Sequence, residues 1–321
     1  MTLPGGLKVH CAQRVFLGGL LVALAACHSD VRPDPQKLAA WTTTLRAQQP
    51  ADAFGAVYKH GDDRLVFVGA SHTEDIASLT FTMIHDAYAS FDIDAVIVEG
   101  SQRSRGPNAD KLLRWVASQP EHEGRQPGGE LVAAVRGASA EGAVVWGGEP
   151  DDAQIRDTLT SEGVAAADLL GFYTLRSVPQ WLREQRIASA DDPRGPALID
   201  AELAHNRERL GLPPPILPDT AAWMQWYERT NGKPFGSGFE LEEAGPLADG
   251  RFASNRVAAA IERARDAFLL QSIADHVNEG QSVQVVFGES HLMRLRPALE
   301  AMLGPACYVG SDLAAAASGE C

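Results

Sequence analysis

Apolar residues along the chain follow two different spacings. Short runs rich in β-branched and aromatic residues occupy positions 66–68, 95–98, 143–146 and 285–287, and such runs predict buried strands. In the segments between them, such as residues 73–91, apolar residues recur mostly every three or four positions, which is the spacing of a helix. Strand-like and helix-like segments alternate along the chain. This order predicts a three-layer α/β/α fold with a mostly parallel or mixed central sheet.

Residues 160–255 have a different character, because strand-like runs are missing and helix-like stretches alternate with segments rich in proline and glycine. We expect a largely helical insertion that caps the carboxyl edge of the sheet. Its aromatic residues Trp223, Trp226 and Tyr227 are candidates for a substrate groove or, at their helical spacing, for a core. The predicted organisation begins with a signal peptide at 1–26, followed at 27–50 by a lipid-attached tether and a first helix over 35–46. The two halves of the α/β domain, at 51–159 and 256–321, lie on either side of the insertion.

Two of the strand-like runs end in the same pattern, Gly-x-x-His. The pairs are Gly69 with His72 and Gly288 with His291. A glycine there lets the chain turn sharply out of the strand, and open α/β sheets bind ligands at the carboxyl ends of their strands.

The other two runs lead to Glu99 and Glu149. If the four strands are neighbours, two imidazoles and two carboxylates converge on one cleft. That set suits a divalent metal site or general acid–base hydrolysis. The alternative is structural, with glutamates that cap loops and histidines that satisfy local hydrogen bonds. The repeated pattern favours function. Gly-x-Ser-x-Gly and His-Glu-x-x-His are missing from the sequence, which argues against a serine hydrolase of that type and against a zincin protease.

The N-terminus has the pattern of a bacterial lipoprotein signal. Lys8 and Arg14 accompany an apolar segment, residues 15–26, that is too short to span a bilayer and ends in LAA followed by Cys27. This resembles the lipobox, whose cysteine is acylated and becomes the mature N-terminus; an ordinary secretory signal or an uncleaved anchor is the alternative. His28, rather than an aspartate, follows and resembles an outer-membrane signal. We expect the acylated Cys27 to hold the protein on a lipid bilayer in the cell envelope, facing the periplasm.

Export leaves Cys307 and Cys321 as the remaining thiols, and an even pair in an exported chain predicts a disulfide. The formal net charge is −14, and removal of the signal takes away two basic residues. Such an acidic chain argues against a nucleic-acid partner and against a polybasic attachment to anionic lipid.

The order of the motifs resembles a known family. A helix that contains Arg265-Asp266 precedes the second Gly-x-x-His, an acidic residue (Glu99) follows the second strand, and residues 146–154 form a Gly-x-Glu turn that leads to a glutamine. This arrangement resembles the Tiki/TraB family, which is grouped with erythromycin esterases and ChaN-like haem-binding lipoproteins. The resemblance covers about half of the mature chain. It implies an α/β/α fold in which the two histidines face each other. Members are described as metal-dependent peptidases, as hydrolases that open a macrolactone, or as haem binders.

Our leading hypothesis is a metal-dependent hydrolase of amide or ester bonds with a peptide or small-molecule substrate. His72 and His291 would bind a divalent cation of the manganese, cobalt or zinc class, together with Glu99 or Glu149, and the other glutamate would be the general base. Arg265 would stabilise an oxyanion or hold a substrate carboxylate. A metal-free esterase, in which His72 or His291 activates water directly and a glutamate orients the imidazole ring, is the second hypothesis. A lipoprotein that binds haem through a histidine is the third.

Overall fold

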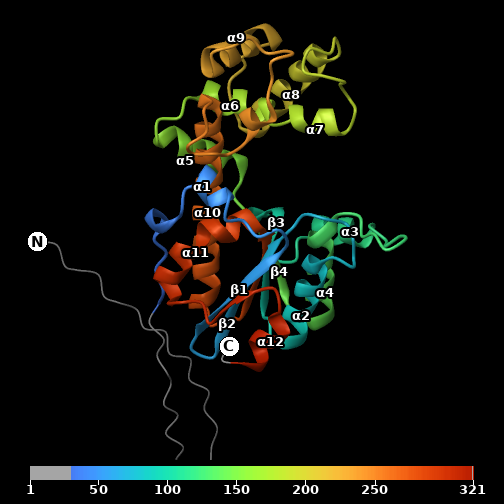
Figure 1. The fold of residues 1–321 in the computed structure, drawn as a ribbon, viewed down its shortest axis with the longest axis vertical. Helices are drawn as coiled ribbons and strands as arrows, with labels where there is room; N and C mark the ends of the chain where they lie inside the picture. The colour runs from blue at the N-terminus through green and yellow to red at the C-terminus, as the bar shows by residue number, and fades with distance from the viewer. Residues whose placement is uncertain (1–29, 320) are drawn as a thin grey trace, which may run out of the picture.

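The computed structural model describes residues 30–319 and Cys321. Its centre is a six-stranded sheet in the order β4-β3-β5-β2-β1-β6. Figure 1 shows this sheet with helices around it. The strands are β1 (Phe54–His60), β2 (Asp63–Ala70), β3 (Ala95–Gln102), β4 (Val144–Glu149), β5 (Val283–Gly288) and β6 (Tyr308–Gly310). Strands β4, β3, β5 and β2 are parallel, whereas β1 is antiparallel to both β2 and β6. The sheet is therefore mixed, and the predicted fold class is confirmed.

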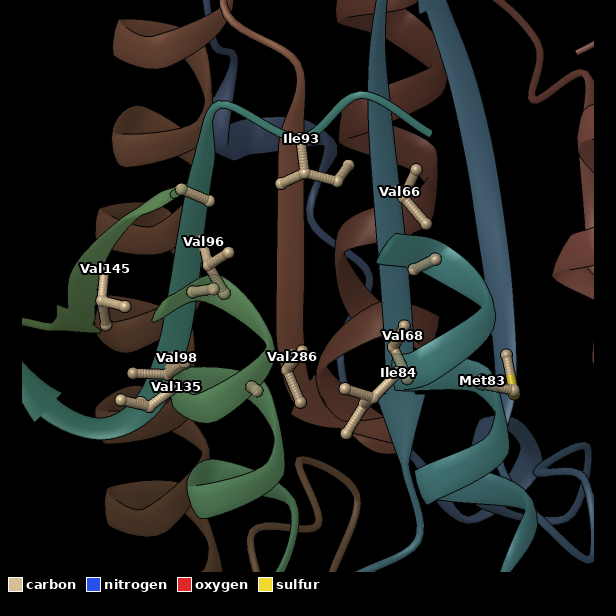
Figure 2. Packing of buried hydrophobic residues seen from close by; sticks show 14 of the residues in the cluster. Val66, Val68, Met83, Ile84, Ile93, Val96, Val98, Val135, Val145 and Val286 are labelled. Carbon is tan, nitrogen blue, oxygen red and sulfur yellow. The ribbon is translucent and has the colours of Figure 1, made fainter. Parts of the chain in front are cut away.

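Helices cover both faces of the sheet because successive strand residues point to opposite sides. On one face, Val66 and Val68 of β2 pack with Val96, Val98 and Val286 against helices (Figure 2). These helices are α2 (Leu79–Ser90), α3 (Asp110–Ala117), α4 (Gly129–Glu141) and α12 (Leu313–Ser318). On the other face, Leu65 and Phe67 pack with residues of α10 (Ala253–Asn278) and α11 (Glu289–Leu303). The molecule thus has the expected three layers.

The insertion forms a helical unit with a hydrophobic core of its own. It contains α6 (Ala166–Leu175), α7 (Val178–Arg183), α8 (Gly195–Arg209), α9 (Thr220–Asn231) and the short 3-10 helix η3 (Leu241–Ala244). Its core also includes Ile155 of α5 (Asp152–Ser161) and Ile261 of α10, so the unit extends beyond the predicted boundaries at both ends. Trp223, Trp226 and Tyr227 are buried in this core and line no groove. Figure 1 shows α10 running from the helical unit into the sheet domain.

Three local predictions were wrong or incomplete. Residues 35–46 form no continuous helix but two short pieces, the 3-10 helix η1 (Pro35–Lys37) and α1 (Thr43–Arg46). The segment between them is extended, because Leu38 and Trp41 are both buried against the domain. The helix after His72 starts only at α2, with Ser78 as its N-cap. Strand β1, which makes a hairpin with β2, was not predicted. A further 3-10 helix, η2 (Arg103–Arg105), follows β3.

The C-terminal segment is tied back to the sheet. The structure joins Cys307 and Cys321 in a disulfide, the pairing that the sequence predicts. The carbonyl oxygen of Cys321 also accepts a hydrogen bond from Arg64 Nε of β2. Within the described residues, no helix is long and apolar enough to cross a membrane. The predicted signal and Cys27 lie outside the residues that the structure describes.

Candidate functional site

The four predicted site residues belong to four neighbouring parallel strands: Glu99 and Glu149 lie in β3 and β4, and His72 and His291 follow β2 and β5. Ala70 pairs with Gly288 across β2 and β5, and Val98 pairs with Val286 across β3 and β5, so the ends of these strands are level. The peptide N–H of Gly288 donates to Glu99 Oε2 at 2.7 Å. The structure therefore brings His72, Glu99 and the second Gly-x-x-His together at the carboxyl edge of the sheet, below the helical unit.

The glycines of the two motifs have a packing role rather than the predicted turning role. A Cβ on Gly288 would lie 3.0 Å from His72 Nε2 and 3.5 Å from Glu99 Oε2, so this position leaves space for both side chains. A Cβ on Gly69 would lie 2.8 Å from the carbonyl oxygen of Phe54 and 3.1 Å from Glu289 Cα. Both glycines lie in strands with ordinary negative φ and permit close approach of neighbours.

His72 is the accessible imidazole of the site. Its side chain is 64% exposed, and its Nδ1 lies 2.5 Å from Glu130 Oε1 at the start of α4. This hydrogen bond raises the pKa of His72 above its usual value of 6.5, against the opposing effects of burial and of the charge on His291. A carboxylate on Nδ1 fixes the ring and leaves Nε2, the nitrogen that faces Gly288, as the one able to take up a proton.

His291 is the buried imidazole, with only 4% of its side chain exposed. Its Nδ1 lies 2.5 Å from Asp266 Oδ1, and Asp266 also accepts from Arg294 Nε. Nε2 of His291 lies 3.5 Å from Glu99 Oε1 and 3.6 Å from Glu262 Oε2. Burial opposes protonation, but Asp266 and Glu99 outweigh it and raise the pKa of His291 to about 9. His291 is therefore an imidazolium at neutral pH.

Arg265 connects three carboxylates at the centre of the site. Its Nε donates to Glu149 Oε2 at 2.8 Å and its Nη2 to Glu149 Oε1, which makes a bidentate pair. Nη2 also donates to Glu99 Oε1 at 3.0 Å, and Nη1 donates to Glu262 Oε1 at 2.7 Å. Four of the five N–H groups of this guanidinium donate to carboxylates, so in this arrangement Arg265 mainly organises the glutamates.

The cations keep the buried glutamates ionised. Burial alone would raise the pKa of Glu99, but His291, Arg265 and the Gly288 amide hold it well below its usual range. Burial would also raise the pKa of Glu262. The positive charges of Arg265, His291 and Arg294 outweigh this effect and lower the pKa of Glu262 to about 2. Neither Glu99 nor Glu149 is free of a cation, which differs from the expectation that one of them is an available general base.

An open cavity of about 530 Å³ lies beside His72. It is lined by His72, Thr73, Glu74, Arg125, Gly128, Gly129 and Glu130. Its wall is mostly polar, and Gly128 and Gly129 at the N-terminus of α4 form part of it. A small polar substrate fits this cavity better than a large apolar one.

The expected cofactors can be tested against this arrangement. A metal-binding imidazole must be neutral, whereas His291 is held protonated, and the Arg265 and Arg294 guanidiniums already neutralise the carboxylates around it. In the part of the chain that the structure describes, no three His, Cys, Asp or Glu side chains are grouped to hold a metal ion. For haem, the polar cavity at His72 offers no apolar walls for a porphyrin. In this conformation the residues fit neither group.

Comparisons with protein-family models, curated proteins and solved structures find no match. The resemblance to the Tiki/TraB family therefore rests on the order of the motifs alone.

Sequence reasoning missed three charged residues of the site. Glu130 lies 58 positions from His72 in the sequence, at the start of another helix, and nothing in the local pattern connects them. Arg294 and Glu262 had a usable signal. Arg294 follows His291 by three residues and Glu262 precedes Arg265 by three, which places each pair on one face of a helix.

Proposed function

We propose that this protein is a hydrolase of ester or amide bonds that works by general acid–base catalysis without a metal. The observation that carries the proposal is the unlike environment of the two imidazoles, one exposed and one buried. His72 is accessible, fixed by Glu130 through Nδ1 and free to accept a proton on Nε2. His291 is buried and carries a fixed positive charge. Paired titratable groups in unlike environments are a common basis of acid–base catalysis.

In the proposed reaction, His72 Nε2 removes a proton from water as the water oxygen bonds to the substrate carbonyl carbon. Negative charge develops on the carbonyl oxygen, and the His291 imidazolium stabilises it electrostatically. Collapse of the tetrahedral intermediate breaks the bond to the leaving group, which takes the proton back from His72. Glu130 holds the His72 ring and stabilises its protonated form, and Glu99 and Asp266 keep His291 charged.

The proposal is tested by turnover of a panel of p-nitrophenyl esters, lactones and short peptides with purified protein from residue 28 onward. His72→Ala should lower kcat/KM by about 100-fold or more, the usual contribution of a general base. The fold should persist, because the His72 side chain is mostly exposed. His85→Ala is the matched control, since the His85 side chain is 83% exposed on α2. Equal rates for wild type and His72→Ala would refute the role of His72.

Metal dependence is decided in the same assay. Dialysis against a chelator should leave kcat/KM unchanged, and addition of manganese, cobalt or zinc ions should not raise it. A rate that disappears on dialysis and returns with one of these ions would favour the metal-dependent hydrolase of our leading sequence hypothesis and overturn the metal-free one.

We also propose that Cys27 is acylated and anchors the protein to the envelope membrane, because LAA precedes this cysteine directly after an apolar segment. Cys27→Ser should move the protein from the membrane fraction to the soluble fraction, or block its processing. Membrane fractionation identical to that of the wild type would contradict the anchor.

A further inference from the structure

A second cavity borders the charged cluster. Its volume is about 160 Å³. It is lined by Ala39, Ala40, Trp41, Pro246, Ala248, Ala259 and Ala260, with the charged residues Glu262, Arg263 and Arg294. Glu262 and Arg294 also surround His291, so the cavity and the proposed catalytic cluster share these two side chains. A cavity of this size is comparable to one that holds a benzene molecule.

The walls of this cavity are held by specific contacts. The peptide N–H of Ala39 donates to the carbonyl oxygen of Arg294 at 2.9 Å, and that of Ala248 donates to the carbonyl oxygen of Trp41 at 2.7 Å. Trp41 itself is only 7% exposed. The N-terminal segment is therefore fastened to both α11 and the loop before α10. The space exists because small alanines face each other across it.

Arg294 gives the cavity a polar group that is not fully used. Its side chain is 3% exposed, and its Nε and Nη2 donate to Asp266 and Glu262. Among the described residues, Nη1 has no hydrogen-bond partner, and the guanidinium carbon lies 5.8 Å from the centre of the Trp41 ring. Arg294 lines the cavity, so a ligand oxygen in the cavity would give Nη1 an acceptor.

The guanidinium groups that line the cavity, rather than the net charge of the surrounding cluster, favour an anionic acceptor. Two arginines and one glutamate line it, and both oxygens of that glutamate, Glu262, already accept from Arg265 and Arg294. The remaining wall is apolar. A carboxylate on a compact apolar body matches both parts, since carboxylates form charge-assisted hydrogen bonds with guanidinium groups.

We propose that this cavity is a binding site for a benzene-sized monocarboxylate, with the carboxylate on Arg294 and the apolar body between Trp41 and the alanines. The proposal does not rest on the hydrolase function, because it is read from the cavity alone. It predicts that Trp41 senses the ligand directly.

The test is titration of the protein with benzoate, followed by the indole N–H signals in NMR and by calorimetry. We expect binding with a dissociation constant on the order of 1 mM, as for other ligands of this size, and a shift of the Trp41 signal, assigned with Trp41→Phe. Benzamide, which lacks the charge, should bind about tenfold more weakly, and benzene more weakly still.

The decisive variant is Ala259→Phe, which fills the cavity from α10. It should weaken benzoate binding at least about tenfold, whereas Ala201→Phe, at an exposed position of α8, should bind as the wild type does. If Ala259→Phe does not fold, Ala248→Leu fills the same space from the loop. Benzoate binding that is undetectable in the wild type at about 50 mM, or unchanged by filling the cavity, overturns the proposal. Binding of benzamide as tight as that of benzoate overturns the role of Arg294.

Discussion

The buried contact between His291 and Asp266 should make the stability of this protein depend on pH in the alkaline range. The folded structure raises the pKa of His291 from 6.5 to about 9. A raised pKa means that the folded state binds the proton more tightly than the unfolded state. The resulting stabilisation is fully present below pH 6.5 and is lost as the pH rises through 9. At about 1.4 kcal/mol per pH unit, its size is about 3 kcal/mol.

Asp266→Asn removes the main partner of this proton and leaves Arg294 without its nearest counter-charge. We expect two results from urea unfolding followed by tryptophan fluorescence between pH 6 and 10. The free energy of unfolding should fall by about 3 kcal/mol over this range in the wild type and by much less in Asp266→Asn. At pH 6.5 the variant should also be less stable by about 3–5 kcal/mol, as is usual when one partner of a buried ion pair is removed.

Asp275→Asn is the matched control, because Asp275 lies on the same helix but is exposed. It should keep both the stability and the pH dependence of the wild type. His72 also has a raised pKa and contributes an effect of the same sign, so the comparison is made on the difference between each variant and the wild type. A wild-type stability that is flat from pH 7 to 9.5, or an unchanged slope in Asp266→Asn, would refute the assignment of His291 as a stabilised imidazolium.

Three further predictions concern the site and the C-terminal segment. Glu130→Gln removes the group that raises the pKa of His72, so the acidic limb of the kcat/KM profile should move to lower pH; an unmoved limb would show that His72 is not the titrating base. Gly288→Ala places a methyl group 3.0 Å from His72 Nε2 and should lower kcat/KM by about tenfold or more, with a melting temperature close to the wild-type value; full activity would contradict the close approach. The Cys307–Cys321 disulfide closes a loop with a sequence separation of 14, and its reduction should lower the free energy of unfolding by about 2–4 kcal/mol. The measurement compares unfolding with and without reductant in the wild type and in Cys321→Ser, whose stability should not respond to reductant.

The sheet and the meeting of four site residues could be predicted because both depend on local sequence. Strands β2, β3, β4 and β5 are apolar enough to be recognised without their partners, and parallel neighbours bring their carboxyl ends together. The apolar run of β1 is shorter, and the strand also contains Gly55, Lys59 and His60. The sequence pattern alone therefore does not distinguish this strand from a loop.

The sequence alone does not predict which charged side chains pair with one another. Arg265 was recognised as a site residue, yet its three carboxylate partners come from β3, β4 and its own helix, and only the fold decides that they meet. The same holds for residues 35–46. Their spacing is compatible with a helix, but burial of Leu38 and Trp41 against the domain stabilises an extended segment instead. In both cases tertiary contacts override local preference.

The protonation of His291 also explains why the same motif can be interpreted in two ways. A metal ion and a proton compete for Nε2 of this ring, and the surroundings determine which one is held. Here the four carboxylates Glu99, Glu149, Glu262 and Asp266 face two guanidiniums and one imidazolium, which leaves a single net negative charge for the cluster. A divalent cation would have to displace a proton bound with a pKa of about 9 and then lie close to Arg265 and Arg294. The arginines, rather than the histidines, are therefore the residues on which our proposal of acid–base chemistry instead of metal chemistry rests.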